Sequence, residues 1–131
     1  MSTTALTGLR VLVVDDEDYS RGFFEIALRR CGAVVVSAAT AQAGLDAFRS
    51  VQPDVLVSDL AMAERDGYWL IAQVRALNPR RVVPAIAVTG IAGYQAARAL
   101  SEGFHEYLTK PIDPDRLCAV VRRLASLIRP A

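Results

Sequence analysis

The stretch that decides the fold is RVLVVDD, residues 10–16. Its apolar part has no polar alternation and is rich in β-branched valine, which is typical of a strand buried on both faces of a sheet. The run then ends abruptly in two acidic residues. A second run of the same design, DVLVSD at residues 54–59, also ends in an aspartate. Both runs predict strands of a parallel sheet with carboxylates at their C-terminal ends.

Strand patterns and helix patterns alternate through the rest of the chain. Short apolar runs are separated by longer segments whose apolar residues recur at helical spacing. Because crossover helices cover both faces of a parallel sheet, this alternation predicts an α/β fold with an open, doubly wound, five-stranded parallel sheet. We expect strands at 10–14, 33–37, 54–58, 84–88 and 106–108, and helices at 18–31, 41–51, 66–77, 92–102 and 112–128.

Length and composition fit one compact domain. The chain has 131 residues, of which 53% are hydrophobic and 22% are charged, a balance typical of a folded domain and not of a disordered segment. We expect residues 1–8 to be a short polar lead and residues 9–129 to form the domain. The formal net charge of +1 gives no general attraction to nucleic acid or to a membrane surface, so direct binding to either is not expected.

The sequence shows no pattern for export or for membrane insertion. Its N-terminus lacks the basic and apolar regions of a signal peptide, and no uncharged apolar run approaches the ~18 residues of a membrane span. Cys31 and Cys118 have neither metal-ligand spacing nor a secretory context, which favours reduced thiols in or near the core. We therefore expect a cytoplasmic protein.

Polar side chains follow the predicted strands at the ends where open parallel sheets bind ligands. Asp15 and Asp16 follow the first strand, Asp59 the third, Thr89 the fourth and Lys110 the fifth. Carboxylates gathered at one edge repel one another unless a positive group neutralises them. An oxygen-only set favours Mg²⁺, and a lysine and a hydroxyl are what a transferring phosphoryl group requires. The set predicts phosphoryl chemistry on an aspartate.

Each of these residues has an ordinary interpretation when it is taken singly. Acids after a strand often cap the next helix, and Asp59 and Thr89 could be turn residues. Lys110 is the only lysine among 15 basic residues, yet solvated surface lysines are common. The lone His105 precedes a predicted strand and is interpreted as a turn or surface residue, not as a phosphotransfer histidine. The joint occurrence of acids, hydroxyl and lysine at strand ends favours a functional site.

These motifs resemble those of the receiver domains of two-component response regulators, chemotaxis receivers included, over essentially the whole chain. The stretch LVVDDE at residues 12–17 is similar to the first motif of the family, and DVLVSD with Met62 and Asp66-Gly67 is similar to the phosphoacceptor motif and its loop. Thr89-Gly90 resembles the switch hydroxyl and its small neighbour, and YLTKP at residues 107–111 resembles the closing motif. The resemblance implies a flavodoxin-like (βα)5 fold with strand order 2-1-3-4-5.

The resemblance also implies roles for the acidic residues. Asp59 would accept a phosphoryl group from a phosphohistidine. Asp16, Asp59 and the backbone carbonyl of Ala61 would bind Mg²⁺, and Asp15 would act partly through water. The donor would be a histidine kinase or a histidine phosphotransfer protein. Such a domain is not an enzyme, beyond accepting its own phosphoryl group and losing it slowly.

The switch of the family is carried over in the same way. Lys110 would pair with the phosphoryl oxygens, Thr89 would swing in to hydrogen-bond one of them, and Tyr107 would turn inward. The surface formed by the last two helices and the strand between them would then change, for an effector protein that the sequence does not identify. A phosphorylation-dependent dimer is a further expectation. The Lys110–Pro111 peptide would be cis, which an X-Pro bond allows at small cost.

Three residues depart from the family pattern. The family often has proline where this chain has Ala63, which predicts a more mobile loop. Ala61 and Ile91 occupy positions that resemble those tuning self-dephosphorylation, and neither offers a polar group to position water, so we expect a long-lived phosphoryl state.

Residues 8–16 and 66–71 are similar to receivers of hybrid sensor kinases. The chain is thus expected to be a stand-alone receiver or one from such a kinase.

Three alternatives remain beside this interpretation. DEDYS at residues 16–20 matches the D-x-D-x-S/T motif of haloacid dehalogenase-type phosphohydrolases, but Asp113 and Asp115 beside Pro114 are better explained as helix caps than as its remaining metal site. A flavin binder of the flavodoxin type would need a Ser/Thr/Gly-rich phosphate loop where this chain has DDED, residues 15–18. A docking module without phosphorylation is not favoured, because the acids, Thr89 and Lys110 are all present.

Overall fold

The sheet is the frame on which the rest of the chain is arranged. The computed structural model describes residues 5–90 and 96–128. In this part of the chain a single parallel sheet runs in the order β2-β1-β3-β4-β5. Its strands are β1 (Arg10–Val14), β2 (Val34–Ala38), β3 (Val55–Asp59), β4 (Ala85–Thr89) and β5 (Glu106–Thr109). The predicted doubly wound fold and the strand order 2-1-3-4-5 are both confirmed.

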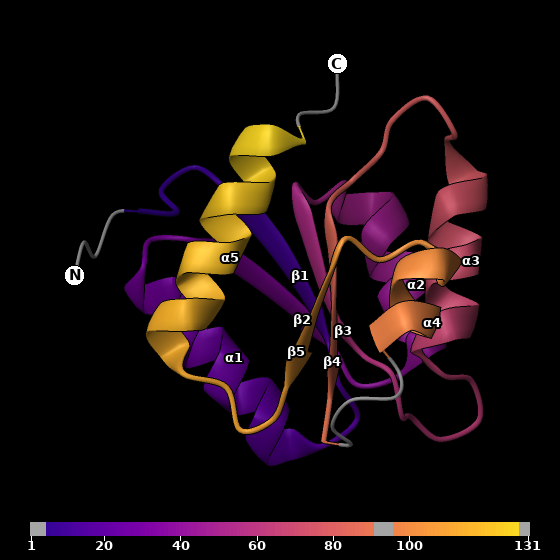
Figure 1. Cartoon of the computed structure of the whole chain (residues 1–131), viewed down its shortest axis with the longest axis horizontal. Coiled ribbons are helices and arrows are strands. Elements are labelled where there is room, and N and C mark those ends of the chain that lie inside the picture. Colours follow the sequence, from indigo (N-terminus) through magenta and orange to yellow (C-terminus); the bar gives the residue numbers. More distant parts are fainter. Residues whose placement is uncertain (1–4, 91–95, 129–131) are drawn as a thin grey trace.

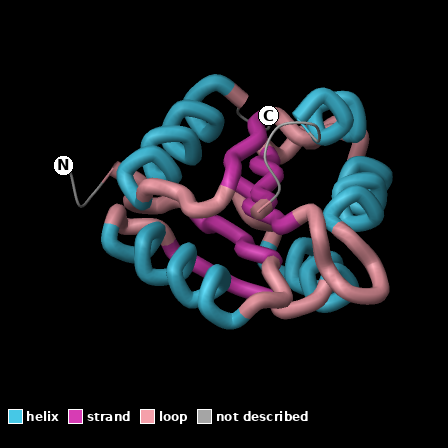
Figure 2. The backbone as a smooth tube through the Cα atoms, turned by 60° about the horizontal axis from the view of Figure 1, so that its bottom comes forward, coloured by secondary structure: helices cyan, strands magenta, loops and turns pink. Residues whose placement is uncertain are grey.

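Helices cover both faces of the sheet, as the alternating pattern predicts. They are α1 (Asp18–Arg30), α2 (Ala41–Val51), α3 (Gly67–Leu77), α4 (Ala96–Glu102) and α5 (Pro114–Leu127). Helices α1 and α5 lie on one face, and α2, α3 and α4 lie on the other (Figures 1 and 2). Among the described residues, no helix has the length and apolar character needed to cross a membrane.

The two faces of the sheet build two separate hydrophobic cores. Successive side chains of a strand point to opposite faces, so Val11 and Val13 of β1 pack with α1 and α5, whereas Leu12 and Val14 pack with α2 and α3. All of these side chains are at most 1% exposed. This burial on both sides explains why the strands read as uninterrupted apolar runs.

The ends of some elements differ from the prediction by one or two residues. The last helix begins at Pro114 and not at Ile112, because the side chain of Asp113 caps it by accepting a hydrogen bond from the N–H of Asp115 at 2.9 Å. Pro114 then occupies the first turn, where its missing N–H costs nothing. Strand β2 is shifted by one residue from the expected 33–37. Residues 92–95 of the fourth predicted helix lie outside the described residues.

The start of α3 packs directly against the end of β3. The N–H of Gly67 donates to the carbonyl oxygen of Leu60 at 3.0 Å, and Asp66 caps the helix by accepting from the N–H of Trp69 at 2.9 Å. A Cβ atom on Gly67 would lie 2.3 Å from the carbonyl oxygen of Asp59. Position 67 therefore accepts only glycine without a shift of the backbone around Asp59.

We expect Gly67→Ala to destabilise the protein by about 2–3 kcal/mol, the upper part of the range for overpacking a tight site. Gly22→Ala is the matched control, because a Cβ atom there meets nothing within 4 Å and alanine should stabilise the interior of α1 by about 0.5–1 kcal/mol. Urea unfolding of both variants measures the difference. If the two substitutions shifted stability equally, the close approach at Gly67 would be energetically irrelevant.

Candidate functional site

The predicted site residues meet at one edge of the sheet. Asp15 and Asp16 follow β1, Asp59 ends β3, Thr89 ends β4, and Lys110 follows β5. The parallel register pairs Val14 with Ser58, Asp59 with Val88 and Thr89 with Thr109. All these strand ends therefore reach the same level, at the lower edge of the sheet in Figure 1. The sheet brings together five polar residues from four separate places in the sequence.

Lys110 lies between two buried carboxylates. Its Nζ atom donates to Asp15 Oδ2 at 3.1 Å and to Asp59 Oδ2 at 3.0 Å. The side chains of Asp15 and Asp59 are 0% and 7% exposed, whereas that of Lys110 is 22% exposed. One ammonium group is thus shared by two carboxylates that are almost completely removed from water.

Burial and hydrogen bonding have opposite effects on the pKa of Asp15, and also on the pKa of Lys110. Burial raises the pKa of Asp15 above its usual value, although hydrogen bonds from the Glu17 N–H and from Lys110 oppose the rise. Burial by itself would lower the pKa of Lys110, but its hydrogen bonds to Asp59 and Asp15 more than compensate and raise it. The lysine is therefore held in its charged form, and the pocket still carries uncompensated negative charge.

The acidic set fits a hard divalent cation. One carboxylate oxygen from each of Asp15, Asp16 and Asp59 lies within 4.8 Å of the others. Asp16 is exposed, so the set is open to solvent on one side. Oxygen ligands and an open side that leaves room for water and a phosphate oxygen are typical of Mg²⁺ sites. Because Lys110 supplies a single positive charge, a divalent cation here would lower the electrostatic repulsion.

Backbone amides complete the site, and the sequence analysis did not find them. The N–H groups of Ala61 and Ala63 donate to Asp59 Oδ1 and Asp16 Oδ2, each at 3.1 Å. The N–H of Glu17 donates to Asp15 Oδ1 at 2.9 Å. Every residue type except proline has this donor, so no sequence motif could have revealed it. Ala61, whose carbonyl is an expected metal ligand, lies in the loop that makes two of these contacts.

Thr89 and Tyr107 lie on the same face of the sheet. Tyr107 pairs with Ala87 across β4 and β5, and Thr89 is two residues beyond Ala87 on its strand. Thr89 is 2% exposed, and its carbonyl oxygen accepts a hydrogen bond from the N–H of Lys110 at 2.7 Å. Tyr107 is half-buried against the core of this face. The hydroxyl and the aromatic ring are arranged along one side of the β4–β5 edge.

The β5–α5 connection has the backbone form that the family resemblance implied. The Lys110–Pro111 peptide is cis.

His105 lies at the other end of β5, where its Nδ1 accepts a hydrogen bond from the N–H of Ala85 at 3.1 Å. It is half-buried, and burial together with the charge of Arg75 lowers its pKa. His105 is thus remote from the acidic edge. Ile91 lies outside the described residues.

The structure does not support the phosphohydrolase alternative. In such an enzyme Asp18 would act beside Asp16, but the Asp18 side chain is 89% exposed and forms an ion pair with Arg21 at 2.6 Å. Ser20 donates to Glu17, which caps α1. These residues begin a helix and do not line the acidic pocket.

Replacing the shared lysine should expose the repulsion between the carboxylates. We expect Lys110→Met to destabilise the metal-free protein by roughly 2 kcal/mol, below the ~3–5 kcal/mol for removing one partner of a fully buried pair. Lys110→Arg keeps the charge and should lose less stability. Urea unfolding in buffer containing a chelator measures both, and equal stability of Lys110→Met and wild type would contradict this account.

The chain is similar in sequence to known proteins over nearly its whole length. The family model of the response regulator receiver domain matches residues 11–122. An uncharacterized 14.6 kDa protein of Leptolyngbya boryana is 40% identical over 119 residues, which make up 90% of this chain and 91% of that protein. The sensor histidine kinase CheAY of Helicobacter pylori is 31% identical over 120 residues, covering 89% of this chain but 15% of the kinase.

A solved structure shares both the fold and the extent of this chain. It is the receiver domain of the sensor histidine kinase PA1611 of Pseudomonas aeruginosa, with a TM-score of 0.81 at 29% identity. The match covers 92% of this chain and 99% of that chain, and that crystal structure has a magnesium ion coordinated in its active site cleft. The family that the motifs indicated is confirmed, and the chain belongs to the response regulator receiver domains of two-component signalling.

Proposed function

We propose that this receiver domain accepts a phosphoryl group on Asp59 and thereby switches a protein-binding surface. The observation that carries the proposal is the position of Asp59, which is buried at the end of β3 with Lys110 Nζ 3.0 Å from its Oδ2 atom. The same carboxylate belongs to the acidic cluster with Asp15 and Asp16. A nucleophile, a fixed cation and a set of metal ligands are the parts that phosphoryl transfer to a carboxylate requires.

In the proposed reaction, an oxygen of Asp59 forms a bond to phosphorus while the bond from phosphorus to the donor histidine nitrogen breaks. The histidine ring takes up a proton from solvent as this bond breaks, so it leaves as neutral imidazole. The Ala61 N–H on Oδ1 and the Lys110 ammonium on Oδ2 hold the carboxylate in a fixed orientation, which removes part of the entropic barrier. As charge shifts onto the phosphoryl oxygens, Lys110 is close enough to stabilise it.

Mg²⁺ is the cofactor that the ligand set supports best. The carboxylates of Asp15, Asp16 and Asp59 would hold it, together with the backbone carbonyl of Ala61. When bound, it would neutralise charge on the transferring phosphoryl group. The magnesium reported for the related receiver of PA1611 is consistent with this assignment.

The switch would operate through Thr89 and Tyr107. A phosphoryl group on Asp59 adds about −1.5 to −2 charge and three acceptor oxygens, which attract the Lys110 ammonium and the Thr89 hydroxyl. Thr89 and Tyr107 share a face of the sheet, so a shift of Thr89 toward the phosphoryl group leaves space that the Tyr107 ring can enter. Phosphorylation would then shift an existing equilibrium between two arrangements.

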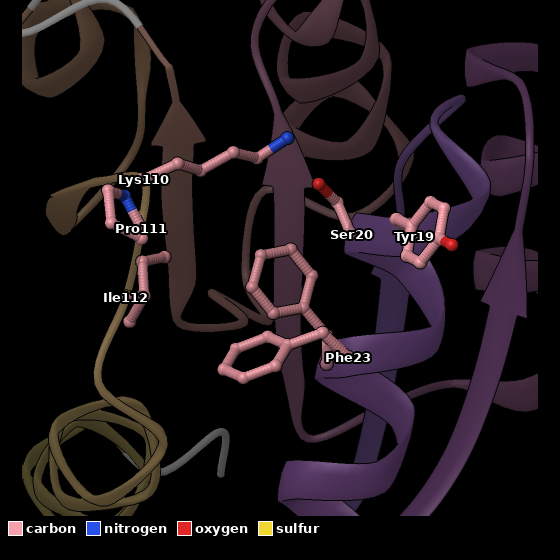
Figure 3. A pocket seen from close by; sticks show the side chains of 7 residues that line it. Tyr19, Ser20, Phe23, Lys110, Pro111 and Ile112 are labelled. Atoms are coloured by element: carbon pink, nitrogen blue, oxygen red, sulfur yellow. The ribbon is translucent and has the colours of Figure 1, made fainter.

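The phosphohistidine donor must cover this edge of the sheet, and an apolar pocket lies beside it. The pocket has a volume of about 440 Å³ and lies between α1 and the β5–α5 connection. Its lining residues are Tyr19, Ser20, Phe23, Phe24, Lys110, Pro111 and Ile112 (Figure 3). Tyr19 is 90% exposed, and aromatic side chains are enriched in protein interfaces. A histidine kinase or phosphotransfer protein docked here would bring its histidine close to Lys110 and Asp59.

Incubation with Mg²⁺ and acetyl phosphate tests the phosphoacceptor. We expect a mass increase of one phosphoryl group, mapped by mass spectrometry to Asp59, and no labelling of Asp59→Asn. Labelling at any other residue would overturn the proposal. The decay of the label after the donor is removed also measures the expected long lifetime, which follows from the absence of a polar side chain at Ala61.

Thr89→Ala tests the coupling between the phosphoryl group and Tyr107. Because the nucleophile and its cation are unchanged, this variant should still be labelled at Asp59. Backbone and ring NMR signals of Tyr107 should shift in the wild-type protein on saturation with beryllofluoride, a phosphoryl mimic, and shift much less in Thr89→Ala. Equal shifts in the two proteins would show that Thr89 does not transmit the signal.

A further inference from the structure

We propose that the backbone N–H of Ala63 is a positioning group of the cation site. It holds the Asp16 carboxylate in place and, with it, the loop that carries Ala61. The inference rests on the proposed function, because it assumes that the acidic cluster binds a divalent cation. Ala63 is not among the expected Mg²⁺ ligands, and the sequence motifs give its N–H no role.

The first support is the pattern of hydrogen bonds between one loop and two carboxylates. The N–H of Ala63 donates to Asp16 Oδ2, and the N–H of Ala61 donates to Asp59 Oδ1, both at 3.1 Å. Asp16 precedes Ala63 by 47 positions, so this contact joins the β1–α1 connection to the loop after β3. Asp16 keeps a second oxygen, Oδ1, that is not used in these bonds, whereas Asp59 Oδ2 also accepts from Lys110. A carboxylate oxygen has two acceptor positions, so the loop orients both carboxylates and leaves lone pairs for a cation.

The second support is the shape of the loop around Ala63. Glu64 has a φ of 65°, a left-handed conformation that is uncommon for a residue other than glycine. The N–H of Arg65 donates back to the carbonyl oxygen of Ala63 at 2.8 Å, which closes a tight turn. The Arg65 guanidinium lies 4.3 Å from the centre of the Trp69 ring and donates to Gln42 Oε1 at 3.3 Å. These contacts join the turn to α2 and α3.

The third support is that, among the described residues, the Ala63 N–H makes the hydrogen bond that fixes the Asp16 carboxylate. Asp15 and Asp59 are buried and bound by Lys110, whereas Asp16 is exposed. An exposed carboxylate samples several rotamers, and fixing it costs conformational entropy when a cation binds. A hydrogen bond made before binding removes part of that cost. Partners that orient a ligating side chain typically change metal affinity by about 10–100-fold when they are lost.

The contact depends on which residue type occupies position 63. Alanine has an N–H that reaches Asp16, whereas proline has no N–H to donate.

The test compares two variants that differ in the backbone donor. Ala63→Pro removes the N–H, and Ala63→Ser keeps it with a side chain of similar size. Calorimetric titration with Mg²⁺, in buffer without phosphate, should show binding weakened about tenfold in Ala63→Pro and unchanged in Ala63→Ser. Unchanged or tighter binding in Ala63→Pro would overturn the inference, because it would mean that the N–H does not assist the cation or competes with it.

A second modification separates the lost N–H from the rigidity of the proline ring. An ester in place of the Met62–Ala63 amide removes the donor and leaves the side chain unchanged. The ester protein should also bind Mg²⁺ about tenfold more weakly. If only the proline variant were weakened, or if Ala63→Pro failed to fold and the ester bound normally, the inference would be wrong. Absence of Mg²⁺ binding in the wild-type protein would instead refute the proposed function itself.

Discussion

Three carboxylates gather at the carboxyl edge of the sheet, where one ammonium group is shared by two of them, and the rest of the site depends on this imbalance. Lys110 contacts Asp15 and Asp59 at 3.1 and 3.0 Å, and both carboxylates are buried. In a partly buried pocket, charges interact more strongly than they do in water. Burial raises the pKa of Asp15 despite the nearby lysine. A divalent cation at the acidic cluster would lower the repulsion between these carboxylates.

The stability of the parallel sheet allows the fold to tolerate this concentration of charge. Its apolar strands bury both faces against helices, and the two cores that result contain most of the buried side chains of the described chain. Burial of that apolar surface stabilises the fold, so a few unfavourable contacts at one edge are tolerated. Because parallel strands end at the same level, the residues at the ends of β1, β3 and β4 lie beside one another there. Stability and site geometry thus come from the same element.

The loop between β3 and α3 connects this charge to the surrounding structure. Where the loop meets α3, Gly67 packs closely against Asp59, and the Gly67 N–H donates to the carbonyl oxygen of Leu60. Between these residues, backbone amides point at Asp59 and Asp16. Asp59 is thus hydrogen-bonded to this loop through the Ala61 N–H. It is also joined to the β4–β5 edge, because Lys110 contacts Asp59 with its ammonium group and donates its N–H to the carbonyl oxygen of Thr89.

The sequence by itself determined the sheet, its order of elements and the residues at its functional edge. Uninterrupted apolar runs can only be buried on two sides, and RVLVVDD and DVLVSD place their acids at strand ends whatever the details of packing. Tertiary structure decided the contacts that no residue type encodes. Examples are the amides of Ala61 and Ala63 on the carboxylates and the exclusion of a Cβ atom at Gly67. These depend on backbone atoms and on segments distant in the chain, so they become visible only when the chain has folded.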